Sequence, residues 1–462
     1  MLTLSDSRNS RRHFLTAGGL ALGGLSLPQL LSARESLVRV GLPTKDVSVV
    51  FLFMQGGPSQ TETFDPKMTA TSQHRSVTGE TATAIPGVTF GSTFERLATL
   101  ADKFSVVRSF ATGDGNHDIK PIVGRATNGA NIGTIYSRIV GSAHPATGLP
   151  TNVTLLPPAV DSDATKPITS FGRFDSAGPF GAAYAPFVPG GGGSFQENLQ
   201  LRMSADRLGD RRELLTGLER LQRRLDSSGA IGSTTAVRQQ AFDVLFKGVG
   251  EAFDLSNEDP RAVARYDTGP LIRPESIDTR WNNHKLYRDH TQTLGKLMLM
   301  ARRLCQRGAG FVTVNTSFVW DMHADANNAT MSEGMRYCGI PFDHAVSAFI
   351  EDIESLGMRD NVLLVACGEM GRTPKINAKG GRDHWGKIAP LLIYGGGLKH
   401  AGVIGHSDPI AGQPASNPYG IDNLLGTIMH ALFDLGQLRL VQGLPREIQQ
   451  IIERSNPIGE LV

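Results

Sequence analysis

The most constraining feature of the sequence is an uninterrupted apolar run, Val362–Cys367, that stops at a glycine. Such a run predicts a strand buried on both faces of a mostly parallel sheet, because neither set of its alternating side chains is polar. The residues that end the run are Gly368-Glu369-Met370-Gly371. Open α/β sheets bind their ligands at the carboxyl ends of the strands, so we expect a functional site directly after Cys367.

The segment that follows this strand is rich in charged side chains set among glycines. It contains Arg372, Lys375, Lys379, Arg382, Asp383 and His384. Carboxylates, a histidine and several cations in one short stretch are typical of a site for a metal ion, an anion or both. The alternative interpretation is a glycine-rich surface turn with solvated charges, and the rest of the chain favours the site.

Further apolar runs predict strands that alternate with helical segments. Strands are expected at residues 47–54, 104–110, 311–315 (continuing through 318–320) and 389–394, and helices at 119–125, 281–303, 342–356 and 421–435. This alternation favours an α/β fold with a mostly parallel sheet sandwiched between helices, in one domain over residues 34–462.

The middle of the chain has a different pattern. Prolines, glycines and amphipathic leucine-rich stretches, the clearest at residues 197–225, dominate from about residue 127 to 310. We expect a largely helical insertion there that covers or flanks the sheet. His290, inside this insertion, is interpreted as a surface or capping residue.

Polar residues gather where two of the expected strands end. Asp114-Gly115-Asn116-His117-Asp118 precedes the expected helix at 119–125, and a helix N-terminus suits an anion, a nucleophile or a metal ligand. Asp321 and His323 follow the strand at 311–320. Positions two apart in an extended chain project to the same face, so both side chains can bind one ion.

The first 33 residues predict a signal for export. Ser10-Arg11-Arg12-His13-Phe14-Leu15 matches the twin-arginine pattern, and an apolar run at 16–31 and small residues at 32–33 follow it. The run is shorter than the roughly 20 residues of a spanning helix, and no later stretch qualifies. We expect the twin-arginine export machinery to deliver a mature chain without a membrane span to the periplasm or cell envelope.

The charge balance argues against a nucleic-acid partner. Lys and Arg number 46 and Asp and Glu 44, and the resulting net charge of +2 is already accounted for by the first 33 residues, which contain three arginines and Asp6. No basic face is implied, so nucleic acid is not an expected partner. The three cysteines are too few and too scattered for a disulfide framework.

Five motifs together resemble the DUF1501 family, a set of exported bacterial proteins often labelled sulfatases. They are Gly56-Gly57-Pro58-Ser59 with Asp65-Pro66-Lys67, Asn116-His117, Trp320-Asp321-Met322-His323, Gly368-Glu369-Met370-Gly371-Arg372-Thr373-Pro374 and Gly381-Arg382-Asp383-His384-Trp385. The family in turn resembles a distant branch of the alkaline phosphatase and sulfatase superfamily. That resemblance implies a parallel sheet between helices, a metal centre at the strand ends and a nucleophile at a helix start.

The resemblance implies metal-binding roles for several residues. Asp321 and His323 lie where the superfamily has an Asp and a His ligand of one metal. Glu369 lies where it has the Asp of an Asp-His pair, and His384 where it has a late histidine ligand. Met370, however, stands in place of the histidine of that pair.

The same comparison leaves other positions open. Gln55 stands where the superfamily usually has an acidic ligand. We expect Glu62 or Asp65, from the next turn, to take the place of that ligand. No Ser, Thr or Cys stands at the expected helix start, which makes His117 either a ligand or a nucleophile.

Two functions follow from these observations. The first is an exported hydrolase of phosphate or sulfate esters that depends on a divalent metal, either zinc, manganese or calcium. Its substrate would be a small anionic ester or a sulfated or phosphorylated glycan, attacked directly by water activated at the metal, while cations stabilise the developing charge. The expected metal ligands are Asp321, His323, Glu369, Asp383 and His384, and the expected catalytic residues are His117, Arg372 and Arg382.

The second function is a non-catalytic binding or scaffolding protein of the cell envelope that retains the fold. The missing hydroxyl or thiol nucleophile and Met370 favour it.

Overall fold

The computed structural model describes residues 42–189 and 249–462, and its centre is a seven-stranded sheet in the order β11-β4-β10-β7-β1-β6-β5. Within this sheet only β10 is antiparallel to its neighbours, which confirms the mostly parallel α/β fold. The strands are β1 (Ser48–Phe53), β4 (Ser105–Val107), β5 (Asn152–Leu155), β6 (Phe311–Asn315), β7 (Val362–Cys367), β10 (Leu391–Gly395) and β11 (Val403–Ile404).

The two central strands are buried on both faces. In β1, Val50 and Leu52 point into one hydrophobic core, while Val49 and Phe51 point into the other. The side chains of β7 alternate between the same two cores. A strand without polar side chains is therefore stable only in the middle of such a sheet, as the apolar run predicts.

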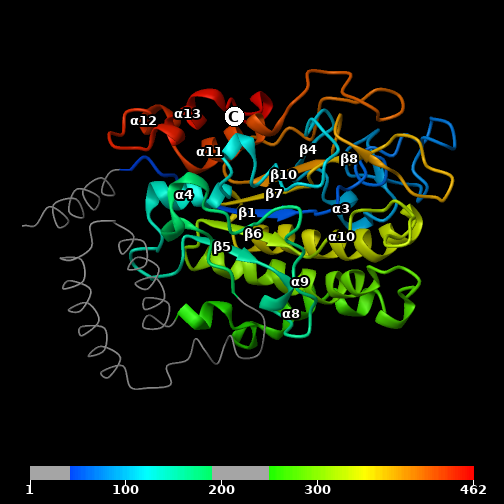
Figure 1. The fold of residues 1–462 in the computed structure, drawn as a ribbon, viewed down its shortest axis with the longest axis horizontal. Helices are drawn as coiled ribbons and strands as arrows, with labels where there is room; N and C mark the ends of the chain where they lie inside the picture. Colours follow the sequence, from blue (N-terminus) through cyan, green and yellow to red (C-terminus); the bar gives the residue numbers. More distant parts are fainter. Residues whose placement is uncertain (1–41, 190–248) are drawn as a thin grey trace, which may run out of the picture.

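Helices cover both faces of the sheet (Figure 1). One layer contains α3 (Glu95–Thr99), α8 (Pro260–Tyr266), α9 (His284–Gln306) and α10 (Met331–Ser355). The opposite layer contains α4 (Ile132–Val140), α11 (Ile421–Leu432), α12 (Leu435–Leu438) and α13 (Arg446–Arg454). Each helix buries an apolar stripe against its face, which places both cores between layers.

Two short antiparallel pairs lie outside the sheet: β2 (Glu80–Ala82) with β3 (Thr89–Gly91), and β8 (Gly371–Arg372) with β9 (His384–Trp385). The second pair matters for the site, because its register sets Arg372 opposite His384. Among the described residues, no helix has both the length and the hydrophobicity of a membrane span.

The middle segment, residues 127–310, is more closely built into the fold than a covering insertion. It supplies α8 and α9 to one layer, but also β5 to the sheet and α4 to the opposite layer. The stretch 197–225 lies outside the described residues. His290, expected at the surface, is buried, and its ring nitrogens contact the Thr316 hydroxyl and the Cys338 carbonyl.

The expected helix at 119–125 is wrong. These residues form turns, and the next α-helix, α4, begins only at Ile132, where the Asn131 side chain accepts a hydrogen bond from the Gly133 amide. Pro121 and Gly124 interrupt the apolar pattern and explain the failure. The loop that carries His117 is therefore not a helix N-terminus.

Two further boundaries differ from expectation. The strand β6 ends at Asn315, because Ser317 has a φ of 155° and the chain leaves the sheet there. Helix α10 begins at Met331, capped by Thr330, eleven residues before the expected start. Pro341 lies inside this helix.

Candidate metal centre

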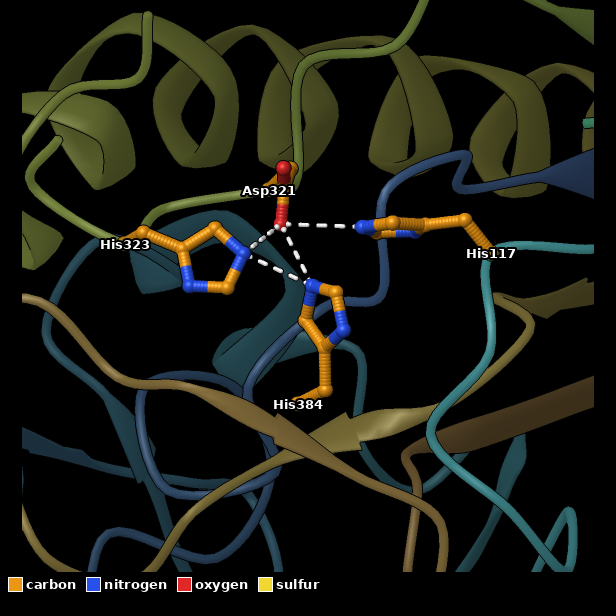
Figure 2. A group of neighbouring side chains, drawn as sticks. All are labelled: His117, Asp321, His323 and His384. Carbon is orange, nitrogen blue, oxygen red and sulfur yellow. Dashed lines mark hydrogen bonds and ion pairs between the residues drawn. The ribbon is translucent and has the colours of Figure 1, made fainter. Parts of the chain in front are cut away.

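Four side chains from distant parts of the chain meet beyond the carboxyl ends of the central strands: His117, Asp321, His323 and His384 (Figure 2). One ligand atom of each lies within 4.8 Å of the others. Asp321 Oδ1 is 2.7 Å from His323 Nε2, and 3.3 Å from Nε2 of both His117 and His384. The three imidazoles thus converge on one carboxylate oxygen.

Three loops deliver these residues. Asp321 and His323 lie between β6 and α10, His117 follows β4, and His384 is held in β9 by its pairing with β8. Gly381 allows the β8–β9 loop to rest directly on the segment of His323, because a Cβ at this glycine would lie 2.1 Å from the His323 carbonyl carbon. Backbone contact therefore sets the distance between His323 and His384.

The spacing of the donor atoms fits a shared cation. His323 Nε2 and His384 Nε2 are 2.7 Å apart, and His117 Nε2 is buried without a hydrogen-bond partner among the described residues. Imidazole nitrogens this close repel one another unless a proton or cation lies between them. Ligands of a tetrahedral zinc ion, each about 2.0–2.1 Å from the metal, stand roughly 3.3 Å apart. The separations of His117 Nε2 and His384 Nε2 from Asp321 Oδ1 match this value, and the two separations of 2.7 Å are shorter.

Electrostatics keep the carboxylate charged. Burial opposes ionisation of Asp321, but the Arg372 guanidinium and the contacts with the three histidines outweigh it and hold its pKa far below the usual range. Burial likewise disfavours the His117 imidazolium, yet its contacts with Asp321 and Glu369 prevail and raise its pKa. The cluster therefore attracts positive charge.

Arg372 holds Asp321 in place from the buried side of the cluster. Its guanidinium is 0% exposed, and it lies 2.6 Å from Asp321 Oδ1 while also donating to the Gly56 and Gly57 carbonyls. Asn328 holds the other Asp321 oxygen at 3.0 Å. With its donors engaged by the protein, Arg372 is placed to fix Asp321 rather than to contact a substrate.

Glu369, expected as a ligand, lies behind His117. It is 1% exposed, and its Oε1 accepts hydrogen bonds from the Gly56 amide at 2.9 Å and from His117 Nδ1 at 3.0 Å. Its Oε2 is buried without a partner among the described residues. Carboxylates in this position orient metal-binding histidines in other proteins, and here the contact fixes the orientation of the His117 ring.

Asp383, also expected as a ligand, lies at the rim. Its side chain is 60% exposed, and its Oδ1 is 3.4 Å from His323 Nδ1 and 3.3 Å from the side-chain nitrogen Nδ2 of Asn377. It contacts the far nitrogen of His323, not the one that faces the cluster.

Arg382, expected as a catalytic cation, belongs to a different network. It is fully buried, and its guanidinium lies 3.1 Å from Glu62 and donates to backbone carbonyls of residues 75, 373 and 374. Asp65 pairs with Lys67 and Arg108. Neither Glu62 nor Asp65 therefore takes the place of the acidic ligand that was expected at position 55. Gln55 itself accepts a hydrogen bond from the Asn315 side chain.

Aromatic rings cover the His117 side of the cluster. The Phe318 ring lies 4.7 Å from the His117 ring, and Phe171 lies 5.1 Å from it and stacks on Phe318. They leave His323 and His384 as the more exposed side of the centre. His117, expected as a catalytic residue and as either a ligand or a nucleophile, thus lies among the four clustered donor side chains, and the Asn116-His117 motif is its signal in the sequence.

Residues 46–461 match the family described as "Protein of unknown function (DUF1501)". No curated protein sequence matches the chain significantly.

Several solved structures are distantly similar. One is i-CgsB in complex with k-i-k-neocarrahexaose (9% identity, 89% of this chain, 78% of that chain, TM-score 0.33). A second is the PsFucS1 sulfatase from Pseudoalteromonas sp. (9% identity, 86% of this chain, 71% of that chain, TM-score 0.34). A third is the lipoteichoic acid synthase LtaP from Listeria monocytogenes (8% identity, 92% of this chain, 82% of that chain, TM-score 0.31). Identities and TM-scores this low do not define an activity for this chain.

Proposed function

The chain belongs to the DUF1501 family, whose description assigns no activity, and from its site we propose that it is a metal-dependent hydrolase of phosphate or sulfate esters. One observation carries the proposal. Three imidazoles and one carboxylate, drawn from three loops, place their donor atoms within 4.8 Å of one another. Folding alone does not require such a convergence, because the ring nitrogens of His323 and His384, 2.7 Å apart, repel one another unless a proton or a cation lies between them.

The donor set favours a transition metal. His117, His323 and His384 contribute three nitrogens, and Asp321 contributes one oxygen. Calcium takes six to eight oxygen ligands and manganese likewise suits oxygen donors, whereas imidazole suits zinc, so zinc is favoured over manganese and calcium. When bound, a divalent ion supplies a Lewis acid for the charge that builds up on the transferred group.

The residues around the centre hold these donors in place. Glu369 Oε1 accepts from His117 Nδ1, which fixes the proton on Nδ1 and leaves the Nε2 lone pair directed at the cluster. Arg372 and Asn328 hold the two oxygens of Asp321. The exposed side, at His323 and His384, is where a small anionic ester or a sulfated or phosphorylated glycan would approach.

A second candidate function is a non-catalytic binding or scaffolding protein. Arg372 already donates to the Asp321 oxygen that faces the imidazoles, at 2.6 Å, which reduces the negative charge available to a cation. A metal centre of lower affinity and without turnover would follow from this contact.

Elemental analysis of the purified protein, combined with assays on 4-nitrophenyl phosphate and 4-nitrophenyl sulfate, tests the proposal. We expect about one transition-metal ion per chain, metal-dependent turnover, and loss of both in His384→Ala. The matched control is His406→Ala, since His406 is exposed and outside the cluster. Metal without turnover would favour the second candidate, and absence of metal would contradict the centre.

Export remains part of the proposal. The twin-arginine motif at residues 10–15 lies outside the described residues and supports delivery to the periplasm or cell envelope. Fractionation of cells that express the protein with Arg11→Lys and Arg12→Lys is the test. We expect the variant to stay in the cytoplasm, and unchanged export would contradict this route.

A further inference from the structure

A cavity of about 410 Å³ opens beside the metal centre, on the His323 side. Its volume falls in the range of small-molecule sites, about 300–1,000 Å³. Asp325, Asn377, Lys379 and Asp383 contribute its polar lining, and two alanines leave the space open. Because His323 belongs both to the cluster and to the cavity wall, a group bound in the cavity lies next to any ester bound at the centre.

The polypeptide fixes both walls of this cavity. On one wall, Ala324 has a left-handed φ of 60°, and Asp325 Oδ1 accepts hydrogen bonds from the amides of residues 327 and 328. On the other wall, Asn377 donates to the His323 carbonyl at 2.9 Å and accepts from the amides of Lys379 and Gly381. A left-handed alanine is strained, and such strain is commonly found at functional sites.

Three polar groups in the cavity lack a protein partner. Asp325 and Asp383 each use only Oδ1, and among the described residues neither Oδ2 takes part in a hydrogen bond or ion pair. The Lys379 ammonium is likewise unengaged within the described part of the chain, where only its backbone amide is bonded. The cavity thus offers two acceptors and one donor.

This combination selects the chemistry of the bound group. A second anionic group would face two carboxylates, and an amine would pair with the carboxylates but would leave the Lys379 ammonium without an acceptor. An apolar group would strip water from three charges without replacing its hydrogen bonds. A hydroxyl both donates and accepts, so several hydroxyls on one group satisfy all three partners.

We propose that this cavity binds a neutral, hydroxyl-rich group, such as a sugar ring, that forms the alcohol part of the ester. This inference rests on the proposed hydrolase function. It also fits the polarity of the centre's surroundings, because the opposite side, at His117, is walled by Phe171 and Phe318. The alcohol part then lies on the His323 side, with the ester group at the imidazoles.

The test compares two esters in the metal-loaded full chain: glucose 6-phosphate against 4-nitrophenyl phosphate, with the corresponding pair of sulfates. The variant combines Asp325→Asn with Lys379→Met, which removes one charge of each sign and leaves the net charge unchanged. The control combines Arg446→Gln with Glu447→Gln on the exposed face of α13, in the opposite layer.

We expect the ratio of kcat/KM for the sugar ester to that for the aryl ester to fall about tenfold or more in the variant, because each lost hydrogen bond involves a charged group. The control should keep the wild-type ratio. An unchanged ratio in the variant, or a preference of the wild-type protein for phosphoethanolamine over glucose 6-phosphate, would overturn the inference.

A failure of the hydrolase proposal is distinguishable from a failure of this inference. If neither ester is hydrolysed, calorimetric titration of the metal-loaded protein decides. Tighter binding of glucose 6-sulfate than of 4-nitrophenyl sulfate, lost in the variant, would support the hydroxyl site, and equal binding would overturn it.

Discussion

The protein contains two buried arginine–carboxylate ion pairs whose surroundings differ, and their arginines are ten residues apart in the sequence. Arg382 lies 3.1 Å from Glu62, Arg372 lies 2.6 Å from Asp321, and both guanidiniums are 0% exposed. Glu62 also accepts hydrogen bonds from the Ser76 hydroxyl and from the amides of residues 77 and 78. Its network is complete.

Asp321 has the same ion pair and a different set of neighbours. The oxygen that Arg372 contacts also faces three imidazoles whose donor atoms crowd one another. The comparison teaches that a buried ion pair does not by itself reveal a site. The groups around it decide whether it is structural or is left able to bind a cation.

The largest expected effect on stability concerns the ion pair of Arg382 with Glu62. Arg382→Met leaves Glu62 buried without its counter-charge, so we expect the free energy of unfolding to fall by about 3–5 kcal/mol. Urea denaturation with and without chelator measures it, and the loss should be the same in both. Arg446→Met, at an exposed position, is the control. A loss seen only without chelator would assign Arg382 to the metal centre.

His290 extends the comparison to a buried imidazole with both nitrogens partnered. Burial is the main cause that lowers its pKa to about 4, from an ordinary value of 6.5. The histidine's contribution to stability is therefore fully present above pH 6.5 and is lost as the pH falls through 4. We expect a loss of up to roughly 3 kcal/mol across this window.

Urea unfolding between pH 7 and pH 4 measures this loss. His290→Gln keeps groups able to bond to Thr316 and to the Cys338 carbonyl but does not titrate. Its stability should depend less steeply on pH, and an equal slope would assign the acid sensitivity to other groups.

Metal removal tests the cluster around Asp321, the carboxylate of the second ion pair. A ligand that binds only the folded protein at 100 times its Kd stabilises it by about 2.7 kcal/mol, so chelation should lower the melting temperature of the wild-type protein. His384→Ala should melt at the same temperature with and without chelator, while His406→Ala should respond like the wild type. Retention of the response in His384→Ala would exclude His384 as a ligand.

The smallest effect should come from the group behind His117. Glu369→Gln keeps the shape but weakens the acceptor for His117 Nδ1, so we expect metal affinity to fall about 10–100-fold. Competition with a chelator of known affinity measures it. Asp383→Asn is the control, because this exposed side chain contacts His323 only at 3.4 Å. A larger loss in Asp383→Asn would reverse the roles assigned to the two carboxylates.

The fold followed from local patterns more directly than the site did. Apolar runs such as Val362–Cys367 predicted the central strands, because burial on both faces leaves a continuous signature in the sequence. Motif resemblance brought Asp321, His323 and His384 into one expected group, and the structure brings them together.

The partners of the remaining charged residues depend on contacts between distant segments. Glu369 meets His117 across 252 positions, and Arg382 meets Glu62 across 320. Nothing in the residues near Arg382 distinguishes it from Arg372. The helix expected before α4 failed for a local reason, since Pro121 and Gly124 outweighed the apolar pattern.

The four donors of the centre are spread from His117 to His384, and the last is fixed by the pairing of β9 with β8. A ribosome-bound chain that ends before β9 therefore lacks one of the four donors. A metal ion that needs all four donors would therefore bind only after β9 has been synthesised and has paired with β8. A truncated product would be recognisable by its inability to retain the ion, whatever else of its structure survives.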